Sequence, residues 1–218
     1  MTNSFPPQEK KFESERINMV TVQILDRGIT DTAVLRSMRK VPRHLFIPKE
    51  YQKLAYDDGP LPIGYGQTIS QPYIVAYMTE AVKPMSDNIA LEVGTGSGYQ
   101  AAILAEIVKE VYSVEIVPEL AKESAERLSK LGYKNVTIRF GDGYKGWKEH
   151  SPFDVIMVTA AAEQIPQPLI EQLAENGRLV IPIGAPEEVQ ELILLEKKNG
   201  RIEKHRLTFV RFVPFKRL

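Results

Sequence analysis

A glycine-rich turn lies near the middle of the chain and reads Leu91-Glu92-Val93-Gly94-Thr95-Gly96-Ser97-Gly98. Apolar residues before it predict a strand over residues 89–93, and an amphipathic stretch after it predicts a helix over residues 98–108. Gly94 and Gly96 let the backbone turn sharply and approach a ligand with no side chain in between. Gly98 is expected to let the helix pack close to the strand. A turn of this kind between a strand and a helix is typical of a nucleotide-binding α/β unit.

Strands and helices alternate after the turn. The expected strands are 89–93, 111–115, 136–140, 154–159 and 178–183, with helices over 98–108, 118–131 and 166–174. Several of these strands are almost purely apolar, as in a parallel sheet that is covered on both faces. The pattern predicts a Rossmann-like, doubly wound and mostly parallel sheet. A strand over 190–196, the turn Asn199-Gly200 and a strand over 207–213 predict an antiparallel hairpin at its edge.

The N-terminal part has a different pattern. Residues 1–13 are expected to form a frayed arm, followed by helices over residues 14–28 and 31–42 that flank or cover the sheet. Residues 57–72 contain three prolines and three glycines, which predicts a long functional loop without regular structure. A helix over residues 74–81 follows it.

We expect one domain over residues 1–218, with a helical extension and active-site loop in 1–72 and a cofactor-binding α/β core in 73–218. The 28 Lys and Arg residues balance the 28 Asp and Glu residues, so the formal net charge is zero. This disfavours nucleic acid and anionic membranes as partners. The sequence contains no cysteine, which excludes disulfides, cysteine-ligated metals and a cysteine nucleophile. No apolar run predicts a signal peptide or a membrane span, so we expect a cytoplasmic protein and a monomer. His44, His150 and His205 have no partner at ligand spacing in the sequence, so no metal site is expected.

Acidic residues at three successive strand ends indicate which nucleotide the turn holds. The spacing Gly-x-Gly-x-Gly differs from that of dinucleotide sites, and an anionic Glu92 would repel a pyrophosphate but attract the positively charged methionine end of S-adenosylmethionine. Glu115 is expected to bind ribose hydroxyls, and Asp142 the adenine amino group. The expected cofactor-binding residues in this part of the chain are Glu92, Gly94, Thr95, Gly96, Gly98, Glu115, Asp142 and Gly143.

The fourth strand of the predicted sheet narrows the chemistry. Enzymes that methylate nitrogen often place Asn or Asp, then Pro-Pro and an aromatic residue, at its end. This chain instead has Val158-Thr159-Ala160-Ala161-Ala162, which leaves room for a substrate but supplies no nitrogen-orienting carbonyl.

Six stretches of the sequence resemble the protein-L-isoaspartate (D-aspartate) O-methyltransferases. They are Gly66 to Pro72, Leu91 to Ala102, Gly141 to Gly143, Phe153 to Ala161, Gly177 to Gly184 and Arg211 to Pro214. Many methyltransferases share the glycine-rich turn, but the Gln-Thr-Ile-Ser-x-Pro loop is particular to this family. The tail ends soon after Pro214, so contacts that longer members make beyond it are not expected here.

The resemblance implies transfer of a methyl group from S-adenosylmethionine to the free carboxylate of L-isoaspartyl, and also D-aspartyl, residues in damaged proteins. The resulting ester cyclises to a succinimide, which can reopen as normal aspartate. Ser70 matches the catalytic serine, and Thr68 and Ile69 match the methyl-transfer and cofactor pocket. Thr68 and Ser70, with Val213 and Pro214, match positions that hold the peptide. Some members have Ala-Pro-His after the serine, whereas this chain has Gln71-Pro72-Tyr73, so no histidine is assigned a role.

Methyl transfer to a carboxylate does not require Ser70 to act as a nucleophile or as a general base. A carboxylate with a reference pKa near ~4 is already a nucleophile at neutral pH, so Ser70 is expected to orient groups by hydrogen bonding rather than to react. Two alternatives remain. A methyltransferase acting on RNA or a small molecule is disfavoured by the neutral charge and by residues 67–72, and a dehydrogenase-like nucleotide-binding domain by Glu92 and the glycine spacing.

Overall fold

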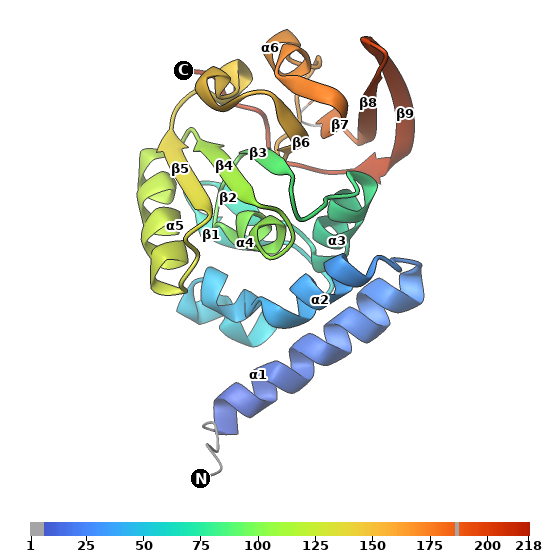
Figure 1. Cartoon of the computed structure of the whole chain (residues 1–218). Coiled ribbons are helices and arrows are strands. Elements are labelled where there is room, and N and C mark those ends of the chain that lie inside the picture. Colours follow the sequence, from blue (N-terminus) through green and yellow to red (C-terminus); the bar gives the residue numbers. More distant parts are fainter. Residues whose placement is uncertain (1–6, 186–187) are drawn as a thin grey trace.

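A seven-stranded sheet forms the centre of the computed structural model, which describes residues 7–185 and 188–218 (Figure 1). Its strand order is β5-β4-β3-β6-β7-β8-β9. The strands are β3 (Ile89–Val93), β4 (Glu110–Glu115), β5 (Val136–Phe140), β6 (Phe153–Val158), β7 (Leu173–Ile183), β8 (Gln190–Lys198) and β9 (Arg201–Val210). Pairing is parallel from β5 to β7 and antiparallel from β7 to β9. The predicted doubly wound sheet with an antiparallel hairpin is confirmed.

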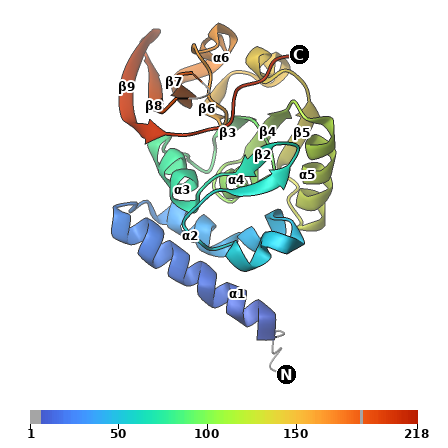
Figure 2. The same cartoon turned by 180° about the vertical axis from the view of Figure 1, so that it is seen from behind.

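Both faces of the sheet are buried, because successive strand residues point to opposite sides. In β3, Ala90 packs into one apolar core and Leu91 and Val93 into another. The first core is covered by α3 (Pro72–Ala81), α4 (Tyr99–Ala105), α5 (Pro118–Lys130) and the N-terminal helices. The second is covered by α6 (Gln167–Glu171) and the short 3₁₀ turns η5 (Gly143–Lys145) and η6 (Lys148–His150), on the opposite side in Figures 1 and 2.

The first N-terminal helix begins earlier than predicted. Helix α1 (Pro7–Asn18) continues into the π-helical η1 (Met19–Ile24) and the 3₁₀ turn η2 (Leu25–Arg27), so the expected frayed arm is wrong over residues 7–13. Phe12 anchors α1, because it is buried and stacks on His44 with ring centroids 4.1 Å apart. Residues 1–6 lie outside the described residues. Gly28 ends this run at φ 97°, as expected, and α2 (Thr32–Lys40) is capped by Asp31.

Residues 57–72 are more regular than the sequence predicted. Strands β1 (Leu61–Gly64) and β2 (Gln67–Ile69) form a small antiparallel sheet, preceded by the 3₁₀ turns η3 (Arg43–Phe46) and η4 (Lys49–Leu54). The turn between the strands has positive φ at Tyr65 (54°) and Gly66 (69°), which suits a tight hairpin. Ile63 and Ile69 are buried and anchor the hairpin to the core. The expectation of an irregular loop was therefore wrong for residues 61–69.

The C-terminal hairpin turns where predicted but pairs over a longer stretch. Asn199 and Gly200 have φ of 52° and 71°, and pairing begins at once with Lys198 opposite Arg201. Strand β9 therefore spans Arg201–Val210 rather than residues 207–213. After Val210 the chain leaves the sheet edge and runs back across the end of β6 (Figures 1 and 2).

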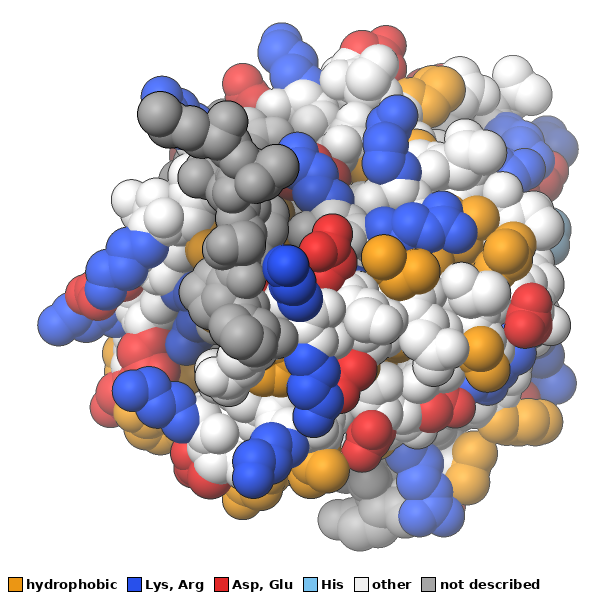
Figure 3. Space-filling view, turned by 90° about the horizontal axis from the view of Figure 1, so that it is seen from below, with side chains coloured by type: hydrophobic (Ala, Val, Ile, Leu, Met, Phe, Trp, Pro, Cys, Tyr) orange, Lys and Arg blue, Asp and Glu red, His pale blue; other side chains and the backbone are white. Residues whose placement is uncertain are grey.

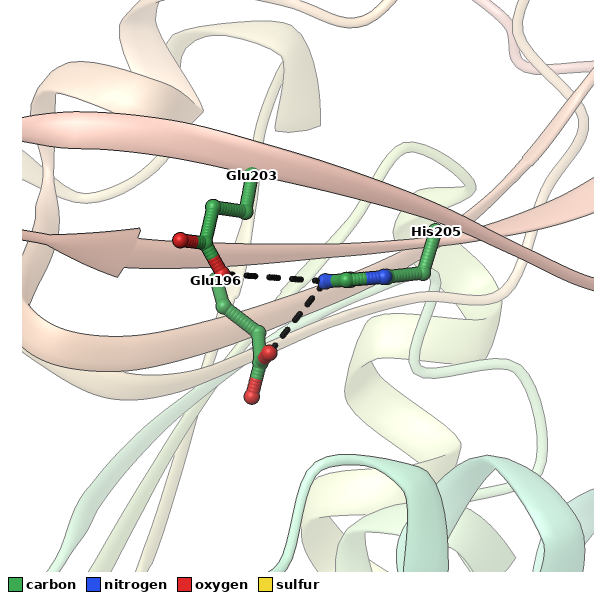
Figure 4. A group of neighbouring side chains, drawn as sticks. All are labelled: Glu196, Glu203 and His205. Atoms are coloured by element: carbon green, nitrogen blue, oxygen red, sulfur yellow. Dashed lines mark ion pairs between the residues drawn. The ribbon is translucent and has the colours of Figure 1, made fainter.

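Charged side chains cross-link this hairpin (Figure 4). His205 Nε2 lies 3.3 Å from Glu196 and 4.0 Å from Glu203, so the expectation that this histidine lacks partners at ligand spacing was wrong. The partners come together because pairing of β8 with β9 places Glu196 opposite Glu203. Lys198 lies 3.1 Å from Glu196 and 3.0 Å from Glu203, and Arg178 also pairs with Glu196. These cations neutralise both carboxylates, so the cluster stabilises the hairpin.

The surface mixes charges of both signs. On the face seen in Figure 3, Lys and Arg side chains lie interspersed with Asp and Glu, in keeping with a formal net charge of +0. Within residues 7–185 and 188–218, no helix has the length and apolar character needed to cross a membrane.

Candidate active site

The glycine-rich turn follows β3, whose neighbours β4 and β6 lie on either side at the point where strand order reverses. Thr159, at the end of β6, holds the turn in place: its hydroxyl donates to the carbonyl of Gly94 (2.6 Å) and also lies 3.1 Å from the carbonyl of Val93. Gly94 has φ 98°, and a Cβ there would lie 2.3 Å from Thr159 Oγ1. Glycine is therefore required at this position both for its conformation and for lack of space.

A cavity of about 60 Å³, here called the turn cavity, lies against this turn. Gly94, Gly96 and Glu115 form one side of it, and Gly143 another. Both carboxylate oxygens of buried Glu115 accept backbone N–H bonds, from Gly96 at 2.7 Å and from Val117 at 2.9 Å. These bonds fix the orientation of the carboxylate toward the turn. A Cβ on Gly143 would lie 2.3 Å from Val93 Cγ1, so this position also excludes side chains.

Glu92 lies beneath the turn, and it is not one of the described residues that line the turn cavity. It is 0% exposed, shares a hydrogen bond with Ser113 on β4, and leaves its Oε1 without a partner among the described residues. Burial, reinforced by the nearby charge of Glu115, raises the pKa of Glu92 to about 8. The carboxyl group is therefore mostly neutral at pH 7. The raised pKa disfavours an anionic Glu92 that attracts the cofactor, and a supporting role for the turn fits its buried position better.

Two other turn residues also contribute through packing. Thr95 Oγ1 lies 2.5 Å from Ser113 Oγ, so a chain of hydrogen bonds links Thr95, Ser113 and Glu92 under the turn. Gly98, at φ 85°, begins helix α4, and a Cβ there would lie 3.2 Å from Leu128 of α5. Its close packing is therefore against a neighbouring helix, not against the strand as predicted.

Asp142 follows β5 and is held by the C-terminal tail. Arg217 Nε lies 3.1 and 3.0 Å from the two carboxylate oxygens of Asp142, and the guanidinium carbon lies 3.6 Å from the ring centre of Tyr144. Tyr144 N–H also donates to Asp142 Oδ1 at 3.1 Å. The carboxylate keeps free lone pairs for an amino group, but any ligand there must share it with Arg217. This pair could not be predicted from the sequence, because its members are 75 residues apart.

The tail forms the outer wall of the turn cavity. Val213 C=O accepts from Ala161 N–H, and Phe215 N–H donates to Ala161 C=O, both at 2.8 Å. Val213, Pro214 and Phe215 all line the turn cavity, and Val213 also lines a groove on its far side. Pro214, expected to hold the peptide, thus lies on the cofactor side of this wall.

Ser70 lies between two spaces. On one side is a small cavity of about 40 Å³, which Ser70 shares with Thr68, Ile69 and the turn. On the other side is an open groove of about 380 Å³, here called the rim groove, which also contains Thr68. Ile69 is buried, so the β1–β2 hairpin is anchored on one side and presents Thr68 and Ser70 to these spaces. The structure thus brings the predicted catalytic serine to the junction of the turn and the groove.

Thr159 is the functional candidate that the sequence did not identify. It lines the turn cavity, the small cavity and the rim groove. Its position at the end of the fourth strand is a signal in the sequence, but the three alanines that follow it indicate space for a substrate rather than a hydrogen-bonding hydroxyl. Among the described residues, none before Pro60 lines any of the three spaces. The N-terminal helices therefore flank the sheet rather than cover the site.

Comparisons with known proteins agree with this arrangement. A solved structure named protein-L-isoaspartate O-methyltransferase has a TM-score of 0.83 and 28% identity, covering 93% of this chain and 65% of that chain. A Plasmodium falciparum protein described as a protein-L-isoaspartate O-methyltransferase, solved with S-adenosyl-L-homocysteine, has a TM-score of 0.81 and 32% identity, covering 92% of this chain and 98% of that chain.

Sequence comparison gives the same family. A protein-L-isoaspartate O-methyltransferase of Opitutus terrae is 56% identical over 209 residues, which cover 96% of this chain and 90% of that protein. The model of the family protein-L-isoaspartate(D-aspartate) O-methyltransferase (PCMT) matches residues 15–217. The chain therefore belongs to the protein-L-isoaspartate(D-aspartate) O-methyltransferase family.

Proposed function

We propose that this enzyme transfers a methyl group from S-adenosylmethionine to the free carboxylate of L-isoaspartyl residues, and of D-aspartyl residues, in damaged proteins and peptides. The observation that carries the proposal is the position of Ser70 and Thr68. They separate the glycine-rich turn, where a nucleoside would bind, from an open groove that can admit a peptide. The similar Plasmodium falciparum protein was solved with S-adenosyl-L-homocysteine, the product form of the proposed cofactor.

The residues of the turn cavity fit that cofactor. Gly94 and Gly143 leave space where a Cβ would lie 2.3 Å from a neighbouring side chain, so backbone can approach a ligand there. Glu115 is held in place for ribose hydroxyls. The tail forms the outer wall of the turn cavity, so we propose that it shifts outward when the cofactor enters.

When bound, S-adenosylmethionine supplies a methyl group that its sulfonium already activates. The chain then has to align the acceptor oxygen with this methyl group and exclude water, which can contribute several kcal/mol. We assign the orientation of the acceptor carboxylate to the Ser70 hydroxyl, because Ser70 lines both the rim groove and the small cavity beside the turn. The acceptor carboxylate is ionised at neutral pH, so no general base is required.

The repair outcome follows from the chemistry of the product. The methoxy group of an ester leaves more readily than the oxygen of a free carboxylate. The neighbouring backbone nitrogen can therefore attack the ester carbonyl, release methanol and close a succinimide. Opening of that ring by water gives a mixture of aspartyl and isoaspartyl peptide. Repeated cycles of methylation then convert the damaged form into the normal one.

Conversion of a synthetic isoaspartyl peptide tests this function. With enzyme and S-adenosylmethionine, chromatography should show the succinimide and then the aspartyl peptide accumulating, and a D-aspartyl peptide forms the second arm. Persistence of the isoaspartyl peptide with the cofactor present would refute the proposal.

We also propose that the enzyme acts as a monomer in the cytoplasm. A chain with Cys 0 has no need of an oxidising compartment, which fits the cytoplasm. Light scattering should give a mass near 24.6 kDa, and a dimer mass would contradict the first part. Fractionation of the source cells tests the second.

A further inference from the structure

The rim groove has a chemical character of its own. Its walls are largely apolar and include Pro60, Ile74, Val189, Phe209 and Phe212. Ser70, Thr68 and Thr159 lie in the same space, so the groove leads directly to the proposed site of methyl transfer. Whatever segment flanks the acceptor residue must therefore lie along these walls.

Two of the apolar side chains are left exposed by the fold. Phe209 near the end of β9 is 72% exposed and Val189 is 49% exposed. Single exposed apolar residues are common and need no explanation. These two, however, share one groove with the catalytic serine, and about 380 Å³ is room enough for a large side chain between them and the groove floor. A peptide side chain placed there would bury apolar area on both partners.

The charge of the groove is also one-sided. Arg211 is the one charged side chain among the described residues that line it, and it is exposed. No carboxylate faces it from the described walls. An acidic residue near the acceptor would therefore be attracted, and a basic one repelled, by an interaction that salt weakens.

We propose that the rim groove selects among damaged sites by the residues next to the isoaspartate. Phe209 and Val189 favour a large apolar neighbour, and Arg211 favours an acidic neighbour over a basic one. This inference rests on the proposed function, because the groove is taken to hold the flanking segment of the methyl acceptor.

Peptides that differ at one position test the apolar preference. The wild-type enzyme is assayed with isoaspartyl peptides that carry Leu, Ser or Gly beside the isoaspartate, first on its N-terminal side and then on its C-terminal side. Partial burial of a leucine side chain predicts that kcat/KM for Leu exceeds that for Ser by about tenfold on one of these sides. In Phe209→Ser the ratio should fall to about one. Val22→Ser removes another exposed apolar side chain, which lies outside the groove (52% exposed), and should keep the wild-type ratio.

A second peptide pair tests Arg211. With Glu or Lys beside the isoaspartate, the wild-type enzyme should prefer Glu at low salt, and both 0.5 M salt and Arg211→Gln should reduce the preference. Thermal unfolding confirms that each variant is folded. Equal kcat/KM for all peptides, or an unchanged Leu preference in Phe209→Ser, would overturn the selectivity while leaving the methyltransferase function intact. Failure to methylate any isoaspartyl peptide would instead overturn the proposed function and this inference with it.

Discussion

Gly94→Ala tests whether the glycine-rich turn requires glycine at this position for its positive φ and for lack of space beside Thr159. At φ 98° an alanine is strained by about 1–2 kcal/mol, and its Cβ would lie 2.3 Å from Thr159 Oγ1. Relief of that clash requires Thr159 to rotate, which breaks the hydrogen bond of its one hydroxyl proton to the carbonyls of the turn, at a cost of about 1 kcal/mol. The loss of unfolding free energy should therefore total about 2–3 kcal/mol, which a typical domain stability of ~5–15 kcal/mol can tolerate.

The same change should reach the cofactor site, because Thr159 and Gly94 both line the turn cavity. We expect calorimetric affinity for S-adenosyl-L-homocysteine to fall at least tenfold, while urea unfolding shows a folded protein. Gly200→Ala is the matched control: its φ is 71°, and no atom lies within 4 Å of the added Cβ. It should show the backbone strain alone and normal affinity.

A double-mutant cycle isolates the clash. In Thr159→Ala the Oγ1 atom is gone, and the nearest remaining atom of that side chain lies 3.7 Å from the added Cβ. Adding Gly94→Ala to this background should therefore cost about 1 kcal/mol less than in the wild type. If Gly94→Ala is no more destabilising than Gly200→Ala and binds the ligand normally, the reasoning about this turn is refuted.

Three further predictions concern the residues around the turn. Because the pKa of Glu92 is raised from 4.5 to about 8, the folded state holds one extra proton between these values, and its stability should fall as pH rises through that window by about 1.4 kcal/mol per pH unit. The difference between wild type and Glu92→Gln in urea unfolding at pH 5 and 8 measures this, and parallel profiles would contradict it. Arg217→Ala removes an ion pair whose arginine side chain is 49% exposed, worth about 1 kcal/mol or less, and should speed ligand release up to about fivefold in stopped-flow mixing; an unchanged rate would argue against the tail as the moving wall. Ser70→Ala should lower kcat/KM for an isoaspartyl peptide by about 10–100-fold, as expected for loss of an orienting hydrogen bond, with calorimetric affinity for S-adenosyl-L-homocysteine retained; full turnover would remove Ser70 from the mechanism.

The sheet and its turn were predictable because their signals are local. Apolar strands, the glycine spacing and the strand-end positions of Glu115 and Gly143 all lie within short stretches, and parallel pairing brings strand ends to one edge. The sequence also led to Ser70, although through resemblance rather than spacing. What it missed depends on contacts between distant segments.

Glu92 and Asp142 show why contacts between distant segments could not be predicted from the sequence. Whether Glu92 faces the ligand or lies under the turn depends on Ser113 of the adjacent strand, and burial then changes its charge. The carboxylate of Asp142 is shared with Arg217, which only the path of the tail brings near. The hairpin at 61–69 was missed because proline and glycine in a single stretch are compatible with both a loop and a tight turn.

Transfer of a labelled methyl group tests the central claim most directly. The enzyme is given methyl-labelled S-adenosylmethionine with an isoaspartyl peptide or with its aspartyl twin of identical sequence. We predict base-labile label on the isoaspartyl peptide alone. Label on both twins, on neither, or in a base-stable form would contradict the account.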